Sequence, residues 1–596
     1  AVLRLVFICS LFFAARLGAQ EGMIPLEELA RPPSSARLDQ IHTVATRAGW
    51  GRWENGLRAA ALQAYERDAA TAAPWYFLYR WAQLFATPRG RAIEQWIKAV
   101  EAAGGGHPNM ASRYESPPGS LSGEVTPELQ RWLIGNEAFA QGFFETLSSQ
   151  DQPVEVLRIL QQLYAASPVL FSDYASLAVA IAVVYDVPPP PDWPHGQVTE
   201  RLLPRRLPAP VEAFNFWVRL DRVNVTAHRL RRLPASELKF VIDTSTPFAE
   251  LTWAQRNVTP PLSEMAKAYD LVGYRQDRVE QGKHSWPGAN YRLETILKEG
   301  GICVDQAYFA TQVGKARGVP TLLFRGAGLD GRHAWFGFLS PTGWVLDAGR
   351  YAEQRLVAGR ARDPQTWREF TDHELLFVSD RFRTTPLYRL SVIHAAFARE
   401  YLRDRNYPLA WRSAREATNR ERRNLGAWQV LLAVQVAAGD EPRVREGTLR
   451  DAMLALQKYP DLERDFGTQL VASLRARGET SVAAVEEQRL VRKYQGERSD
   501  LSIQQAGEML RRSLEKEGLA GQIGTYRQLL ELHGRGAGID FYDKVVLPFV
   551  EHLQRQEQLP AARDALARAR STLRVEKGQQ LDLEMLRLSE KLRAPR

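Results

Sequence analysis

A thiol, an imidazole and a carboxylate follow one another within the stretch from Glu299 to Tyr351. Cys303 comes first, His333 follows, and Asp347 closes the series. In enzymes that transfer acyl groups, an imidazole takes the proton of a thiol, and a carboxylate orients that imidazole. The residue types and their order therefore suggest a cysteine nucleophile with a histidine base, provided that the fold brings the three side chains together.

The segment around Cys303 has the pattern of a helix that begins near this residue. Gly300-Gly301 is typical of a turn, apolar residues recur at helical spacing from 307 to 313, and Gly318 and Pro320 are typical of a helix end. Unpaired amides and the positive end of the helix dipole would favour a thiolate there and donate to an oxyanion. The alternative is that Cys303 is a small buried hydrophobic residue, as free cysteines commonly are.

Two short strands are expected after this helix. The aromatic run 333–339 alternates as strands do, 340–343 favours a turn, and 344–347 favours a return strand. Antiparallel pairing of the two strands brings His333 near Asp347. The alternatives are that His333 is a strand-end residue bonded to the backbone and that Asp347 is a turn former.

The register of this hairpin decides whether the two side chains share a face. His333 and Asp347 are separated by an even number of positions, and strand side chains alternate between faces. A plain four-residue loop would send Asp347 to the wrong face. We therefore predict an odd loop, or a bulge near Gly343 or Gly337, with both side chains on the Cys303 side.

Four motifs in this region resemble the transglutaminase-like superfamily, which has a papain-like cysteine fold. They occur in the family's order, although the step from the last tryptophan to the aspartate is one residue shorter than in its commonest form. The resemblance implies an α+β core, flanked here by mostly helical regions. The motifs are Gly301-Ile302-Cys303, Gly318-Val319-Pro320, His333-Ala334-Trp335 and Trp344-Val345-Leu346-Asp347.

The resemblance also implies roles for the three residues. Cys303 would be the nucleophile, His333 the base and acid, and Asp347 the orienting group. Members of the family form a thioester with an amide substrate and pass the acyl group to an amine or to water. Some are peptidases, and others keep the fold without the activity.

Weaker site candidates lie on either side of the cysteine. The family has a further oxyanion donor upstream of the nucleophile, and Trp286 and Tyr291 are candidates for it, with core aromatic residues as the equal alternative. Gln306 and Asp305 follow Cys303 on the expected helix. They would either face the substrate or cap and pack the helix.

The composition is that of a soluble globular protein of several domains. The chain has 596 residues, of which 45% are hydrophobic and 25% are charged, and its net charge of +9 is modest for this length. The basic run 229–232 lacks interleaved aromatic residues, so we expect no nucleic-acid partner. We expect neither a cofactor nor a metal ion.

Residues 1–19 have the pattern of a secretory signal peptide. Arg4 precedes an apolar run, and small residues stand before Gln20. We therefore expect an exported protein, periplasmic or extracellular, with Cys303 as its single cysteine after loss of Cys9. An uncleaved anchor is the alternative. The apolar stretch from 174 to 187 is too short to span a membrane, which predicts a buried helix and no membrane span in the mature chain.

The remaining chain divides into four parts. Residues 20–190 are expected to be an N-terminal helical region, and 191–270 a linker with a helical lead-in. The transglutaminase-like core is expected over 271–385. Residues 386–596 are expected to be helical and to resemble tetratricopeptide repeats, with an ordinary helical bundle as the alternative. The residues that carry this likeness are Ala398, Tyr401, Ala410, Ala414, Ala417 and Trp428.

One motif beyond the core invites a metal interpretation. Residues 371–374 read Thr-Asp-His-Glu, but no second histidine lies at the spacing that a zinc-binding helix needs. Thr371 and Glu374 instead match a capping box, in which the two residues satisfy each other's amide groups at a helix start.

Two functions follow from these patterns. The first is an exported acyl-transfer enzyme that acts on protein or peptide amides through Cys303, His333 and Asp347. The second is a catalytically silent module in a helical-repeat scaffold, whose C-terminal region binds a protein partner. Residue types alone do not separate transfer to an amine from hydrolysis.

Overall fold

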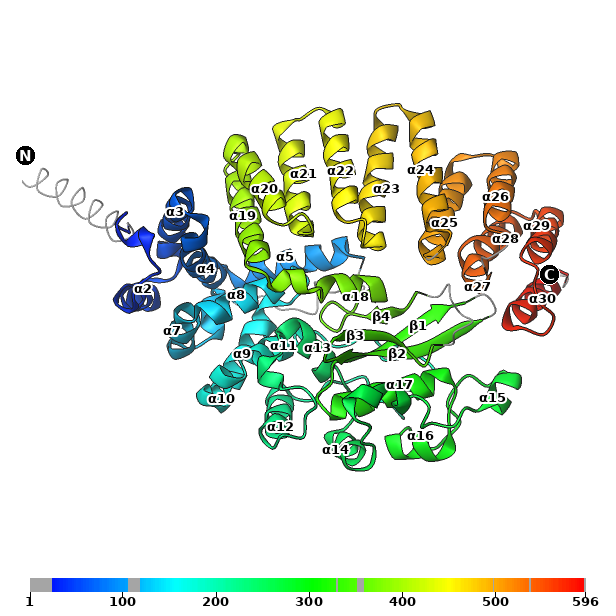
Figure 1. Ribbon diagram of the computed structural model, residues 1–596, viewed down its shortest axis with the longest axis horizontal. Coiled ribbons are helices and arrows are strands. Elements are labelled where there is room, and N and C mark those ends of the chain that lie inside the picture. The colour runs from blue at the N-terminus through cyan, green and yellow to red at the C-terminus, as the bar shows by residue number, and fades with distance from the viewer. Residues whose placement is uncertain are drawn as a thin grey trace, which may run out of the picture.

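A computed structural model describes residues 24–104, 118–328, 331–350, 358–496, 498–534 and 538–593 (Figure 1). The chain is mostly helical, with one five-stranded antiparallel sheet in the order β3-β2-β1-β4-β5. This confirms a mixed α+β class with helical regions on both sides of the sheet. The expected signal peptide, residues 1–19, lies outside the described residues.

The sheet comes from the centre of the chain. Its first three strands form a meander of aromatic and β-branched residues, and two three-residue strands complete the edge. The strands are β1 (Thr321–Ala327), β2 (Arg332–Ser340), β3 (Gly343–Ala348), β4 (Arg360–Arg362) and β5 (Glu369–Thr371).

One helix, α17 (Cys303–Ala316), packs against β1 and β2. Nearly every side chain of this helix is buried, and Phe309 belongs to the same core as the fully buried Phe324 and Trp335. Shorter helices lead into it. They are α12 (Pro210–Arg222), α13 (Ala235–Ile242), α14 (Phe248–Asn257), α15 (Gln276–Glu280) and α16 (Leu293–Glu299).

Before these lies a bundle of nine helices within the described N-terminal residues. Among them, α11 (Ala175–Val184) is apolar on all sides and buried, as predicted for this stretch. In the described residues no helix has both the length and the apolar character to cross a membrane. The others are α2 (Ser35–Ala48), α3 (Gly51–Arg67), α4 (Ala69–Ala86), α5 (Arg89–Ala102), α7 (Pro127–Gly135), α8 (Glu137–Thr146), α9 (Pro153–Ala166) and α10 (Pro168–Asp173).

After the sheet and α18 (Asp372–Val378), successive helices curve over the sheet as an arch, α19 to α26 (Figure 1). The alanine and aromatic positions named for the repeat likeness are buried between α19, α20 and α21. The arch consists of α19 (Pro386–Arg403), α20 (Tyr407–Arg420), α21 (Leu425–Ala438), α22 (Pro442–Ala455), α23 (Pro460–Ala476), α24 (Thr480–Tyr494), α25 (Ser499–Lys516) and α26 (Leu519–His533).

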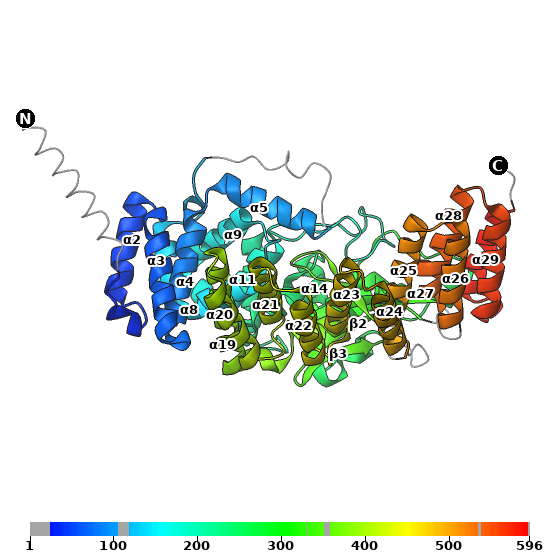
Figure 2. The same cartoon turned by 90° about the horizontal axis from the view of Figure 1, so that it is seen from above.

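The first helix of the arch is fastened to the N-terminal bundle. Arg58 of α3 pairs with Glu400 of α19 at 2.7 Å, and the Tyr65 ring stacks on Phe397 with 4.1 Å between centroids. The last helices descend to the sheet at the other end of the molecule, opposite the N-terminal helices (Figures 1 and 2). They are α27 (Gly538–Phe541), the π-helical turn η6 (Tyr542–Val546), α28 (Leu547–Arg555), α29 (Leu559–Thr572) and α30 (Gln580–Lys591).

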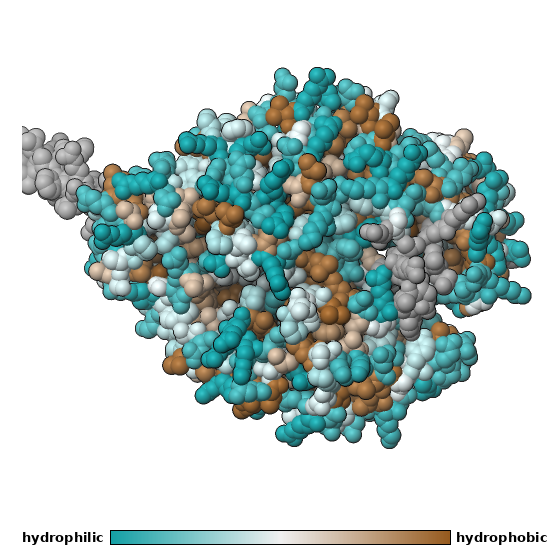
Figure 3. Space-filling model, viewed as in Figure 1, coloured by the Kyte–Doolittle hydropathy of each residue, from teal (hydrophilic) through white to brown (hydrophobic). Residues whose placement is uncertain are grey.

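Apolar side chains gather in two separate cores. The main core extends from Ile24 to Leu501 and includes the sheet, whereas a second core holds residues from Ile503 to Leu592. Ala327, at the end of β1, packs against the second core. The surface of the arch face is mostly hydrophilic, with hydrophobic residues in separate small groups (Figure 3).

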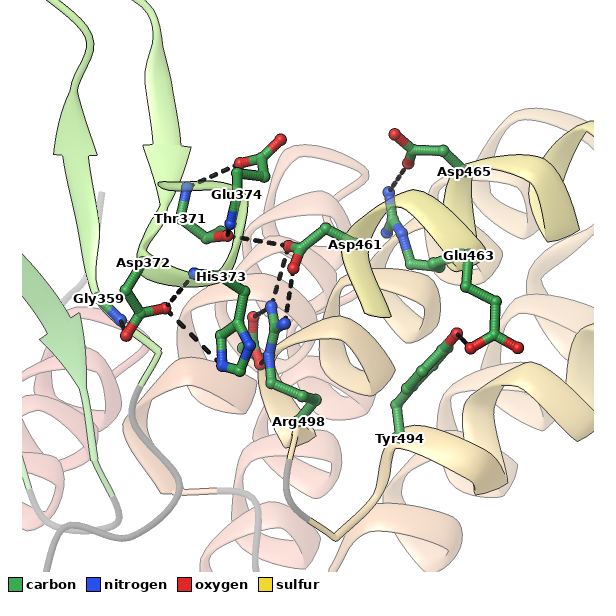
Figure 4. Close-up of polar contacts among 12 residues, drawn as sticks. Gly359, Thr371, Asp372, His373, Glu374, Asp461, Glu463, Asp465, Tyr494 and Arg498 are labelled. Carbon is green, nitrogen blue, oxygen red and sulfur yellow. Dashed lines mark hydrogen bonds and ion pairs between the residues drawn. The ribbon is translucent and has the colours of Figure 1, made fainter. Parts of the chain in front are cut away.

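The 371–374 motif sits where the sheet meets the arch (Figure 4). The Glu374 amide donates to Thr371 Oγ1 at 3.1 Å, and the Thr371 amide donates to Glu374 Oε2 at 2.7 Å, so the predicted capping box is confirmed. Arg498 pairs with Asp461 at 2.6 Å beside it. Within the described residues, no group of three or more acidic, histidine or cysteine side chains is placed to hold a metal ion.

Candidate active site

Cys303 is the first residue of α17, which confirms its predicted place at a helix start. Gly300 precedes it with a φ of +75°, and a Cβ there would lie 2.5 Å from the Gly273 carbonyl oxygen, so the turn requires glycine. Asp305, three residues into the turn, accepts the Ile302 amide at 2.9 Å. This turn fixes the direction in which the thiol leaves the helix.

A buried polar network supports that turn from behind. Asp305 pairs with Arg278 at 2.9 Å and accepts the Tyr291 hydroxyl at 2.8 Å, and all three side chains are buried. Tyr291 also lies 3.1 Å from His195 Nε2. Burial, and then the charge of Arg205, lowers the pKa of His195 to about 3, so this imidazole is neutral.

The thiol itself is protonated at rest. Burial raises the pKa of Cys303 above its ordinary value, and the nearby backbone amides of Ala334, Val304 and Cys303 lower it by less. The amides at the helix start lower the pKa of Cys303, as expected, but desolvation outweighs them and favours the protonated thiol.

His333 is buried near the start of β2 and lies directly before Ala334, whose amide faces the sulfur. Its Nε2 lies 2.7 Å from the Gly349 carbonyl oxygen. A carbonyl only accepts, so Nε2 carries the proton and Nδ1 is the basic nitrogen of the neutral ring.

Tyr269 fixes the positions of Ala334 and of the His333 ring. Its hydroxyl donates to the Ala334 carbonyl oxygen at 2.9 Å, and its ring meets the His333 ring edge to face at 6.3 Å. Gly349 has a φ of +84°, and a Cβ at this residue would lie 2.5 Å from the Tyr269 ring. Only glycine allows this approach, and the approach aims the Gly349 carbonyl at the imidazole.

The hairpin has the predicted bulge. Ser340 pairs with Gly343 across a two-residue loop, but the register shifts between Phe338 and Phe336, so that Gly337 faces two residues of β3. A Cβ on Gly337 would lie 2.7 Å from Phe324 and 3.0 Å from the Val345 carbonyl oxygen. The loop is shorter than the four residues considered from the sequence, and the bulge at Gly337 supplies the shift.

Asp347 lies in this bulge, but the structure does not bring it to His333. Its side chain is exposed, and among the described residues its carboxylate has no hydrogen-bond partner. Its backbone carbonyl accepts the Arg350 amide at 3.0 Å, as in a turn. A contact to the imidazole comes instead from the backbone carbonyl of Gly349.

The weaker candidates are built into the core. Trp286 Nε1 donates to the Asn290 carbonyl oxygen at 2.8 Å, and the Tyr291 hydroxyl donates to Asp305. Neither donor is directed at the thiol. Gln306 Nε2 donates to the Val272 carbonyl oxygen at 2.8 Å, which leaves its buried Oε1 without a partner among the described residues. The backbone amides near the sulfur are those of Ala334, Val304 and Cys303.

Sequence reasoning missed three contributors to the site: Tyr269, Arg278 and the Gly349 carbonyl. No role for Gly349 was expected from the sequence, because a backbone carbonyl has no side-chain signature. No protein-family model matches this chain, and no curated protein is similar enough to count as a relative.

Proposed function

We propose that this chain is an exported, thiol-dependent acyl-transfer enzyme of the transglutaminase-like type that acts on protein or peptide amides. One observation carries the proposal. The Ala334 amide lies close enough to the Cys303 sulfur to lower the pKa of the thiol, and Ala334 directly follows His333. The thiol is therefore tied to the strand end that carries the imidazole.

The proposed chemistry follows from the residue types and their contacts. His333 Nδ1 takes the thiol proton, and the sulfur attacks the carbonyl carbon of the amide. The oxyanion forms beside the amides of Cys303 and Val304. Collapse breaks the C–N bond, and the imidazolium returns its proton to the leaving amine. Water or a second amine, deprotonated by His333, then attacks the thioester and releases Cys303.

The resting arrangement suits such a cycle. A neutral thiol in a buried place resists oxidation until substrate and imidazole act together. The bond between His333 Nε2 and the Gly349 carbonyl holds one tautomer of the ring without a second charge. Hydrolysis and transfer differ only in which nucleophile reaches the thioester.

An acyl-enzyme trap tests the proposal. The full chain is incubated with a library of amide-containing peptides, and the adduct is located by mass spectrometry. We expect an acyl group on Cys303, lost in His333→Ala. Release as a free acid indicates hydrolysis, and incorporation of an added primary amine indicates transfer. No adduct across the library would contradict the proposal.

The variant Asp347→Asn tests whether the exposed carboxylate of Asp347 contributes to turnover. Loss of the orienting carboxylate in a serine-protease triad costs about 10⁴ in turnover. Because Asp347 lacks a bond to His333, we expect its variant to stay within about tenfold of the unchanged enzyme. A loss approaching the triad value would show that Asp347 reaches His333 during turnover.

A second candidate function has its own support. The exposed Asp347 and the raised pKa of Cys303 fit a catalytically silent module whose helical arch binds a protein partner. In that case Cys303 would react with iodoacetamide no faster than expected for a buried thiol, and His333→Ala would not change the rate.

A further inference from the structure

The residues on either side of the loop between β1 and β2, Gly328 and Gly331-Arg332, contact the C-terminal helices, which lie more than 200 residues further along the chain. The Ile539 amide donates to the Gly328 carbonyl oxygen at 3.4 Å, and the Arg332 amide donates to Gln580 Oε1 at 3.0 Å. A Cβ on Gly331 would lie 2.8 Å from that same Gln580 oxygen. The backbone on both sides of the loop thus touches the helices of the second core.

The Arg332 side chain, which is partly exposed, makes the shortest of these contacts. Its guanidinium donates to Glu584 Oε1 at 2.6 Å and to Asp543 Oδ1 at 2.7 Å, so it joins α30 to the π-helical turn η6. Burial alone would lower the pKa of Arg332, but the two carboxylates raise it. A guanidinium shared by two carboxylates holds a defined orientation.

Arg332 is also the residue directly before His333. Successive side chains of a strand point to opposite faces, so Arg332 reaches outward to the second core while His333 is buried. The same short segment then supplies the Ala334 amide that faces the Cys303 sulfur. A shift of the first residue of β2 would move the imidazole and this amide together.

We propose that Arg332 is a positioning residue through which the second core holds the His333 end of β2. The helices of this second core, called the C-terminal unit below, would then set the reactivity of Cys303 through their contact with the strand end. The inference rests on the proposed function. Misplacement of reacting groups by about 1 Å costs about 10² in rate, so a loosened strand end is sufficient for a measurable loss.

The test compares Arg332→Gln with Arg527→Gln in the full chain. Arg527 pairs with Asp564 at 3.6 Å inside the C-terminal unit, where both side chains are about half exposed, so its variant removes an arginine without touching the hairpin. Hydrogen exchange over residues 321–340 reports the position of the strand end without any substrate. The rate of Cys303 alkylation, measured across pH, reports the thiol and its base.

We expect Arg332→Gln to speed hydrogen exchange in the hairpin, to shift the pH profile of alkylation, and to lower acyl transfer about tenfold through kcat with KM little changed. Arg332→Lys keeps the charge but not the two-carboxylate fork, and we expect partial rescue. Arg527→Gln should match the unchanged protein. Salt screens the ion pairs of Arg332, so raised salt should speed hydrogen exchange in the hairpin of the unchanged protein. The change with salt should be smaller in Arg332→Gln, which lacks these ion pairs.

The outcomes separate the two proposals. If Cys303 is reactive and depends on His333, but Arg332→Gln matches Arg527→Gln in exchange and alkylation, the positioning role is overturned and the proposed function stands. If no acyl-enzyme forms but Arg332→Gln still loosens the hairpin and changes Cys303 alkylation, the proposed function fails and the coupling of the C-terminal unit to the thiol is supported.

Discussion

Two helices of the core begin in the same way but for one residue. In α17 and in α18 an acidic residue at the third helical position accepts the amide of the residue before the helix, at 2.9 Å for Asp305 and 2.7 Å for Glu374. In α18 the preceding residue is Thr371, whose hydroxyl accepts an amide in return. In α17 it is Ile302, which has no side-chain oxygen.

The difference shows how a helix start becomes available for chemistry. Thr371 uses its hydroxyl to close the first turn of α18. Ile302 leaves the first amides of α17 without a side-chain cap, and those of Cys303 and Val304 face the sulfur instead. The acidic residue fixes the turn in both helices, whereas the residue before it decides whether the amides serve stability or a reacting group.

The largest expected effect comes from the first residue of α17, and the first residue of α18 is its control. Cys303→Ala should abolish acyl transfer and cost only about 1 kcal/mol of unfolding free energy, because one small, partly buried side chain is lost. Asp372→Asn, at the equivalent position of α18, should leave acyl transfer intact. Turnover assays with denaturant unfolding check both. Activity in Cys303→Ala would exclude the covalent mechanism.

Removing the charge at the third position of α17 should act on stability. Asp305→Asn leaves the buried Arg278 without its ion-pair partner, and breaking a buried pair costs about 3 kcal/mol. Urea unfolding measures this loss. Glu374→Gln is the matched variant in α18, and it should cost less because Glu374 is only partly buried. Equal losses of unfolding free energy in the two variants would mean that the network behind Cys303 contributes no more to stability than the cap of α18.

Removing the side-chain cap of α18 should have a smaller effect. Thr371→Val keeps the shape but loses the bond from the Glu374 amide, and such a loss costs about 1 kcal/mol. Thermal unfolding should show a slightly lower midpoint, with the Cys303 alkylation rate unchanged. A changed alkylation rate would reveal that the two helix starts are coupled.

The smallest effect concerns pH. Because the folded pKa of Cys303 is raised, its neutral form is favoured, so this contribution to stability is full below the unfolded pKa of about 8.5 and is lost as pH rises through the folded value. Alkylation in His333→Ala should rise at higher pH than in a denatured control. Cys303→Ala should lack the decline of stability above about pH 8.5. A midpoint below the control would indicate a preformed thiolate.

Local patterns predicted the parts of the site that local physics determines. The turn at Gly300-Gly301 and the helix after it follow from glycine and apolar spacing, and the bulge at Gly337 follows from counting strand positions. The order of expected helices and strands also predicted the mixed α+β class.

The remaining features depend on contacts that spacing does not encode. Asp347 has the right type and position in the chain, yet the bulge leaves it exposed, and a backbone carbonyl serves the imidazole. Arg278 reaches Asp305 from a separate short helix. The thiol pKa depends on how completely α17 is covered, which is a property of the whole core.

The helices from α19 to α30 are fastened at both ends, and this determines how they can unfold. Stacked helical repeats contact only their neighbours, so an array with a loose terminus frays from that terminus inward. Here Arg58 anchors α19, the first helix of the arch, to the N-terminal bundle, and Arg332 anchors α30, which follows the arch, to the hairpin. The helices from α19 to α30 are therefore held at both ends. Unfolding from the C-terminal side begins by releasing the strand that carries the imidazole.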